Sequence, residues 1–176
     1  MILVGTRKMK KFEGHSHAVT CIDVSVDNNL LASGSLDHTA RIWDLNTGKL
    51  VADPFKCAGI VGAVRFSRDS KKLAVKSGVE TRLEVWDIQE QKLDRTVGKH
   101  GGGFLPNTPV FWTTKDKSIV AAFSFDDDFE DHRTICEFDS STLGAISAPF
   151  EGHNSRITGL ALSFDCASLA SAVVNI

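Results

Sequence analysis

Short runs that alternate apolar and polar residues, separated by turn residues, recur along the chain. The clearest series lies between residues 14 and 44, where three runs rich in β-forming residues cover 19–26, 30–35 and 39–43. Asp and Asn residues, which favour turns, separate these runs. Alternation with a period of two is typical of a strand that has one buried face. We therefore predict a small antiparallel meander in this part of the chain.

One motif, consisting of an apolar residue, any residue, an apolar residue and a Ser or Thr, occurs four times. Its four copies begin at Ile22, Val64, Val110 and Leu160. Nine residues after each start comes another aliphatic residue, namely Leu31, Leu73, Ile119 and Leu169. A constant offset inside copies that start 42, 46 and 50 residues apart predicts a repeated two-strand unit with insertions outside it. No amphipathic period of 3.6 residues persists, so no helix is predicted.

Residues 14–44 resemble one unit of the WD-repeat β-propeller family. Gly14-His15 opens the stretch, Ser33-Gly34-Ser35 is followed by Asp37, and Trp43-Asp44 closes it. These positions match the spacing of the family, whose repeats have a period of about 40–45 residues. The resemblance implies an all-β fold of propeller blades, each an antiparallel four-stranded sheet.

The resemblance covers nearly the whole chain as one domain, 1–176, with roughly three and a half repeats. The repeats cover approximately 12–54, 55–98, 99–149 and 150–176. The second and third are degenerate, and the last is truncated after two predicted strands. Because ordinary rings have about 4–8 blades, the expected architecture is an incomplete ring or open arc. Residues 1–12 are predicted to form one strand that leads into the first repeat.

In the WD-repeat family, a His, a Ser or Thr, an Asp and a Trp form a hydrogen-bonded structural tetrad. The tetrad positions implied by the resemblance are His15, Ser33, Asp37 and Trp43 in the first repeat, and His153 and Ser171 in the fourth. The second repeat lacks the His and has Val75 in place of the Ser. A buried polar network is favourable only when all its members are satisfied. We therefore interpret these residues as structural rather than as a catalytic Ser-His-Asp triad.

The third repeat contains an acidic insertion between its second and third predicted strands. Its residues are Asp126, Asp127, Asp128, Phe129, Glu130 and Asp131. A solvated loop is the first interpretation, and a loop that binds a basic partner is the second, favoured by the aromatic residue inside it. The acidic spacing partly matches a Ca²⁺ loop, but Asp131 stands where that loop requires Gly. No metal site is therefore predicted.

Composition and charge restrict the classes of function that the chain can have. Hydrophobic residues make up 42% and charged residues 24%, as in ordinary globular domains. The formal net charge of −2 gives no general attraction to nucleic acid or anionic membranes, and no segment approaches the roughly 18 apolar residues of a membrane span. The four separated cysteines predict buried thiols in a reducing compartment, with two disulfides as the open alternative. Without a secretory signal, the expected location is the cytoplasm, with the nucleus also open.

These observations predict a non-catalytic protein–protein interaction scaffold with no catalytic residues, no cofactor and no metal. The expected partners are proteins of unknown identity, and not a membrane or nucleic acid. Self-association that completes a ring is also expected. Two alternatives stay open: a truncated fragment of a larger WD-repeat signalling protein without independent function, and an enzyme that uses residues on the propeller face.

Overall fold

The computed structural model describes residues 2–4, 9–78, 82–98, 109–123, 134–155 and 157–173, and this part of the chain is almost entirely β. The strands are β1 (Ile2–Val4), β2 (Met9–Lys11), β3 (Val19–Val24), β4 (Leu30–Ser35), β5 (Thr39–Asp44), β6 (Phe55–Lys56), β7 (Val61–Phe66), β8 (Lys72–Ser77), β9 (Arg82–Asp87), β10 (Lys92–Gly98), β11 (Val110–Trp112), β12 (Ser118–Ala122), β13 (Ile135–Asp139), β14 (Ile157–Leu162) and β15 (Leu169–Val173). A single 3₁₀ turn, η1 (Thr114–Asp116), completes the described elements. Within these ranges, no helix has the length and apolar character needed to span a membrane.

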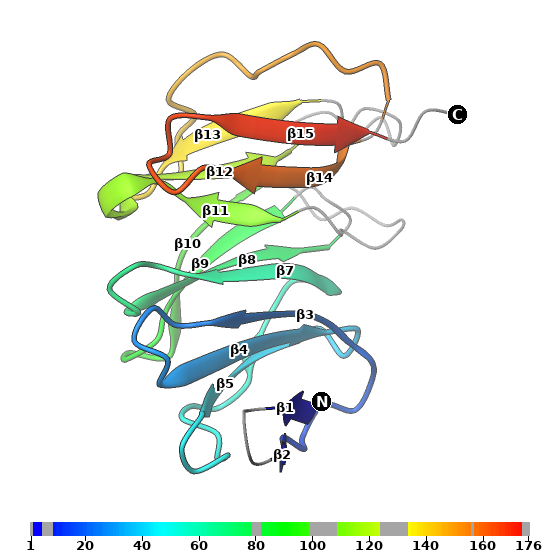
Figure 1. Ribbon diagram of the computed structural model, residues 1–176, viewed down its shortest axis with the longest axis vertical. Coiled ribbons are helices and arrows are strands. Elements are labelled where there is room, and N and C mark those ends of the chain that lie inside the picture. Colours follow the sequence, from blue (N-terminus) through cyan, green and yellow to red (C-terminus); the bar gives the residue numbers. More distant parts are fainter. Residues whose placement is uncertain are drawn as a thin grey trace.

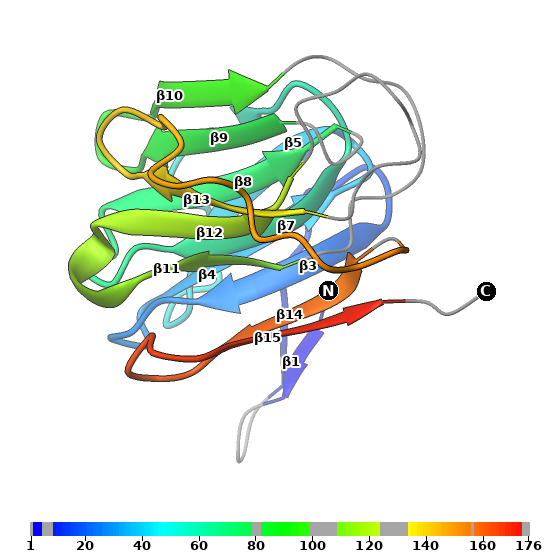
Figure 2. The same ribbon diagram turned by 90° about the horizontal axis from the view of Figure 1, so that it is seen from above.

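The strands form successive antiparallel sheets that stack along the long axis of the molecule (Figure 1). We name them blade 1 (β3–β6), blade 2 (β7–β10), blade 3 (β11–β13) and blade 4 (β14–β15). Blades 1 and 2 are four-stranded, and blade 3 is extended by isolated bridges from Ile135 to Phe150 and from Phe138 to Ala145. Blade 4 and the β1–β2 hairpin lie at opposite ends of the stack, and Figure 2 shows the same sheets from above. The expected all-β blade architecture is confirmed, and the described sheets do not close into a ring.

All four blades share one strand register. The first residue of each motif copy lies opposite the residue eleven positions later, in the pairs Ile22–Ser33, Val64–Val75, Val110–Ala121 and Leu160–Ser171. The third motif residue lies opposite the aliphatic residue that comes nine positions after the start of the motif. The pairs are Val24–Leu31, Phe66–Leu73, Trp112–Ile119 and Leu162–Leu169. A slip of one residue would move every side chain to the other face. Equal registers therefore mean that equivalent positions in the four blades can be compared directly.

Three apolar cores lie between neighbouring blades. In the core between blades 1 and 2, the rings of Phe55 and Trp86 stack with centroids 5.0 Å apart. The core between blades 2 and 3 contains Phe123 and Phe138, which pack edge to face at 5.0 Å. A smaller core joins Ile157 of blade 4 to blade 3. Burying one large apolar side chain contributes about 1.5–3 kcal/mol, so packing between the blades stabilises the stack.

Polar contacts from Asp23 and Arg65 connect blades 1 to 3. Asp23 accepts hydrogen bonds from the Phe66 backbone amide at 2.8 Å and from the Arg65 guanidinium at 3.0 Å. Burial raises the pKa of Asp23, although these donors oppose the shift. On the other side, Arg65 lies 5.0 Å from the centre of the Phe111 ring, and its carbonyl accepts the indole N–H of Trp112 at 3.0 Å. Arg65 therefore contacts both neighbouring blades.

The segment before the first repeat differs from the sequence prediction of one strand. It contains two short strands, β1 and β2, which pair antiparallel with Ile2 opposite Lys11 and Val4 opposite Met9. Four residues separate these strands in the sequence, a common spacing for strands joined as a hairpin. The prediction of one strand was wrong because it was made from the position of the segment before the first repeat, whereas residues 2–4 and 9–11 form separate strands.

Apolar side chains exposed on the outer blades predict self-association. On blade 1, the face turned away from blade 2 includes Ile22 and Val24, which are 50% and 37% exposed, and on blade 4 Ala170 and Ala172 are exposed. Exposed sheet faces and edges favour association. In sedimentation velocity, we expect the average sedimentation coefficient to rise with protein concentration. A single monomeric species with a sharp cooperative melt would contradict this prediction.

Candidate functional site

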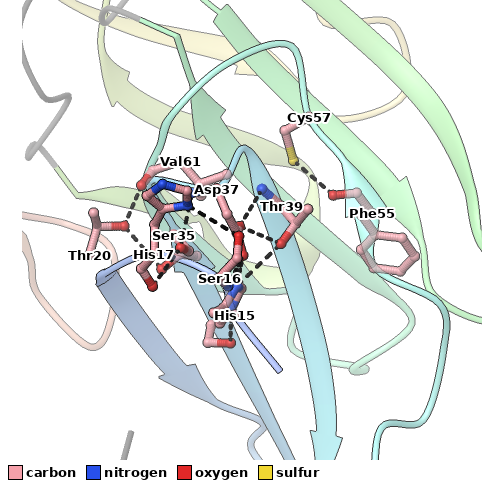
Figure 3. Close-up of polar contacts among 12 residues, drawn as sticks. His15, Ser16, His17, Thr20, Ser35, Asp37, Thr39, Phe55, Cys57 and Val61 are labelled. Atoms are coloured by element: carbon pink, nitrogen blue, oxygen red, sulfur yellow. Dashed lines mark hydrogen bonds and ion pairs between the residues drawn. The ribbon is translucent and has the colours of Figure 1, made fainter. Parts of the chain in front are cut away.

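The connection that leads into β3 and the turn that joins β4 to β5 meet at one end of blade 1. His15 Nδ1 lies 2.8 Å from Asp37 Oδ2, and the Ser16 backbone amide donates to the same oxygen at 3.0 Å (Figure 3). The Thr39 hydroxyl donates to the other oxygen of Asp37 at 2.6 Å. Asp37 therefore fixes the position of both connections.

The hydrogen bonds of His15 continue into the interior of blade 1. Its Nε2 lies 2.8 Å from Ser33 Oγ, which also accepts the Trp43 indole N–H at 2.8 Å. Because a carboxylate only accepts, Asp37 requires the hydrogen on Nδ1, and Nε2 then accepts from the Ser33 hydroxyl. The structure thus brings His15, Ser33, Asp37 and Trp43 into one continuous chain of hydrogen bonds in which each donor has an acceptor.

The Ser-His-Asp order in this chain of hydrogen bonds is that of a hydrolase triad, but the serine hydroxyl is not exposed to a substrate. Ser33 is 0% exposed, and its oxygen already accepts the indole N–H of Trp43. A nucleophile has to reach the substrate within the active site. Buried in this way, the Ser33 hydroxyl has no path to a substrate.

Burial of His15 favours its neutral form. Burial lowers the pKa of His15, and the Arg41 guanidinium adds to the effect, while the Asp37 carboxylate opposes it. For Asp37, burial acts to raise the pKa, but hydrogen bonds from Thr39 and His15 outweigh it and hold the pKa well below its usual range. At neutral pH the network therefore pairs a neutral imidazole with a carboxylate.

This arrangement predicts that mild acid destabilises the protein. Since the folded state lowers the pKa of His15, the unfolded chain binds more protons between the folded pKa and the ordinary value near 6.5, and stability falls as pH decreases through this window. We expect the urea midpoint to be lower at about pH 5.5 than at about pH 7.5. The variant H15Q should show a smaller difference between the two values. An equal difference in both proteins would exclude His15 as its source.

In blade 2 the acceptor for the indole N–H is a buried carboxylate instead of a serine hydroxyl. Glu84 is 1% exposed, and its Oε2 accepts the Trp86 indole N–H at 2.9 Å. Its Oε1 accepts from the Ser77 hydroxyl at 2.7 Å and from the Ala58 backbone amide at 2.9 Å. The guanidinium of Arg82 lies 3.4 Å from the same oxygen. The Glu84 carboxylate thus accepts hydrogen bonds from an indole, a hydroxyl and a backbone amide.

The role of Glu84 was not predicted from the sequence. Glu84 lies opposite Val75 in blade 2, as Arg41 lies opposite Ser33 in blade 1, so the two charged residues occupy equivalent positions. A Glu within an alternating strand is ordinarily assigned to the solvent-facing side. The available signal was a Glu two residues before a Trp in a repeat that lacks both the His and the Ser.

Blade 3 requires no such acceptor, because Phe138 occupies the Trp position and carries no N–H group. Its ring packs against Phe123, and buried Cys136 lies opposite Ala121. In blade 4, the remaining pair is in contact, with His153 Nε2 2.5 Å from Ser171 Oγ. Blades 1 and 4 therefore share a His–Ser pair, whereas blades 2 and 3 carry other side chains at the equivalent positions.

The acidic insertion lies outside the described residues, but its flanks are described. The Phe123 amide donates to the Thr134 carbonyl at 3.1 Å, and the Thr134 hydroxyl donates back to the Phe123 carbonyl at 2.6 Å. These bonds hold together the ends of the β12–β13 connection, which corresponds to the β4–β5 turn containing Asp37. Residues 126–131 belong to this connection.

No described set of three or more His, Cys, Asp or Glu side chains could hold a metal ion. All four cysteines, Cys21, Cys57, Cys136 and Cys166, are free. Burial raises the pKa of the Cys21 thiol to about 11 and that of Cys57 well above its ordinary value. Because the thiolate is the reactive form, burial lowers the reactivity of these two cysteines.

Comparison with known proteins identifies the repeat. The family described as "WD domain, G-beta repeat" matches residues 6–44. The Periodic tryptophan protein 2 homolog of Schizosaccharomyces pombe is 32% identical over 84 residues, covering 48% of this chain and 10% of that protein. The Eukaryotic translation initiation factor 3 subunit I of Phaeosphaeria nodorum is 24% identical over 164 residues, covering 86% of this chain and 46% of that protein.

A third relative, WD repeat-containing protein 70 of Xenopus laevis, is 29% identical over 126 residues, which is 68% of this chain and 20% of that protein. The chain spans less than half the length of each of these three relatives. The matched repeat contains the hydrogen-bonded His15–Ser33–Trp43 chain, and the other blades share its register. The chain belongs to the WD-repeat family.

Proposed function

We propose that this chain is a non-catalytic scaffold that binds a protein partner through one rim of its blades. We define the rim as the connection 13–18, the turn 36–38 and the described ends of the β12–β13 connection, Phe123 and Thr134. The observation that carries the proposal is the contrast within the rim of blade 1. Asp37 is held by His15, Ser16 and Thr39, whereas the neighbouring side chains of His17 and His38 are exposed. Exposed groups on a rigid support are typical of binding surfaces.

The relatives support a role in protein assemblies. WD-repeat proteins generally bind protein partners, and one relative, the Eukaryotic translation initiation factor 3 subunit I, is named as a subunit. The proposed location is the cytoplasm, supported by the free cysteines, which suit a reducing compartment.

For the partner, we propose a basic surface that contacts the acidic insertion. Five of the six residues in 126–131 are Asp or Glu, and the sixth is Phe129. Charges of one sign on a rim raise the rate of association with a partner of opposite sign and set its specificity. An aromatic residue among them adds the apolar contact that interface centres commonly use.

Affinity capture with the intact chain as bait tests both parts of this proposal. A neutralised variant, in which D126N, D127N, D128N, E130Q and D131N are combined, keeps the length of the insertion. Neutralising exposed Glu13 and Glu90 serves as the charge control. We expect the intact chain and the control to capture the same partner, and the neutralised variant to lose it. Equal capture by all three would exclude the acidic insertion, and no reproducible partner would contradict the scaffold role.

A further inference from the structure

A cleft lies between blades 3 and 4, and comparison with the tetrad of blade 1 indicates what could occupy it. The cleft has a volume of about 530 Å³ and is lined by residues of blades 3 and 4, among them Ile135, Glu137, His153, Leu169 and Ser171. This volume lies within the range of ordinary ligand pockets. Within the part of the chain that the structure describes, β15 pairs only with β14, so its other edge carries no strand.

Equal registers identify what fills the equivalent space in blade 1. Leu169 and Ser171 of β15 correspond to Leu31 and Ser33 of β4, because each pair occupies the same place opposite the first strand of its blade. In blade 1, strand β5 pairs with β4, and the Trp43 side chain lies opposite Leu31. The edge of β15 that does not pair with β14 therefore corresponds to the edge of β4 that pairs with β5, and the cleft corresponds to the space that the Trp43 side chain fills in blade 1.

His153 and Ser171 in the cleft are the counterparts of the His15–Ser33 pair that holds Trp43 in blade 1. His153 Nε2 contacts Ser171 Oγ at 2.5 Å, as His15 Nε2 contacts Ser33 Oγ at 2.8 Å. In blade 1 the Ser33 oxygen accepts the Trp43 indole N–H, and Ser33 is 0% exposed. Ser171 is exposed, and no described indole donates to its oxygen. The acceptor for an indole is thus in place and accessible.

We propose that the edge of β15 and this cleft form a docking site for an extended segment of a protein partner that carries a tryptophan. The segment pairs with β15 as an added strand, and its indole enters the cleft and donates to Ser171 Oγ. Glu137 and Glu151 line the same cleft and favour a basic residue near the tryptophan. This proposal deepens the scaffold function and rests on it.

The chain itself supplies a probe, because β5 carries both features, Arg41 and Trp43. A fluorescein-labelled peptide with the sequence of residues 37–46 is titrated with the full chain, and binding is measured by fluorescence anisotropy. We expect saturable binding that is abolished when the peptide Trp is replaced by Ala. Replacement by Phe, which keeps the ring but removes the N–H, should weaken binding about five- to tenfold, the effect of one hydrogen bond.

The variant S171A should weaken binding of the Trp peptide by a similar factor and leave binding of the Phe peptide unchanged, since both changes remove the same hydrogen bond. The variant T158A, which changes an exposed hydroxyl on β14, is the matched control and should bind normally. Absent binding, or equal losses with both peptides, would overturn the proposal. A dimer of this chain that the S171A substitution dissociates would also overturn the proposal, because the edge of β15 would then bind a second copy of the chain. Partner capture through the acidic insertion is measured separately, so either proposal can fail alone.

Discussion

Trp43→Ala is expected to lower the free energy of unfolding by about 3–5 kcal/mol, the usual cost of deleting a buried Trp. Trp43 is 2% exposed, and its ring packs edge to face on Phe12 with centroids 5.7 Å apart. The substitution also removes the N–H that donates to Ser33. Both the apolar contact of the N-terminal segment with blade 1 and the end of the hydrogen-bond chain would be lost.

Urea unfolding of the wild type, Trp43→Ala and Trp43→Phe separates these contributions. The Phe variant keeps most of the apolar contact with Phe12 and loses only the hydrogen bond to Ser33, so it should fall between the other two proteins. A midpoint for Trp43→Ala close to that of the wild type would mean that blade 1 is not folded around this residue.

The order of the strands was predictable because each repeat carries its own register in the sequence. The nine-residue offset from Ile22 to Leu31 recurs in every copy of the motif. The first two strands of each blade therefore pair in the same register, and equivalent residues take equivalent places in the four blades. Residues that contact each other across a blade could be placed only through the family resemblance, since 18 residues separate His15 from Ser33. Local pattern alone carries no information about such a contact.

Glu84 and the β1–β2 hairpin were not predictable for different reasons. The partners of Glu84 come from three segments, and its burial depends on the packing of blade 2 against blade 1 rather than on the alternation within β9. Tertiary context commonly overrides the local preference of a strand residue in this way. For the hairpin, two runs of three residues each are too short to be distinguished from one interrupted strand.

Blades 1 to 3 satisfy one physical requirement in different ways. A buried indole N–H needs an acceptor, because an unpaired buried donor is costly. Blade 1 supplies the Ser33 hydroxyl, which His15 and Asp37 orient, and blade 2 supplies the carboxylate of Glu84. In blade 3 the donor itself is absent, because Phe138 replaces the Trp. The second repeat is degenerate in sequence, yet its buried indole N–H has an acceptor.

Glu84→Ala should therefore be among the most damaging substitutions in blade 2. It would leave the Trp86 indole, the Ser77 hydroxyl and the Ala58 amide without their acceptor, and each buried group left unsatisfied costs about 1–3 kcal/mol. Glu84→Gln retains one acceptor oxygen and should lose less. If the cost arises from the stranded indole, adding W86F to E84A should destabilise less than W86F does alone in the wild type. Urea unfolding of the four variants measures this coupling, and strictly additive losses would show that Glu84 and Trp86 stabilise blade 2 independently.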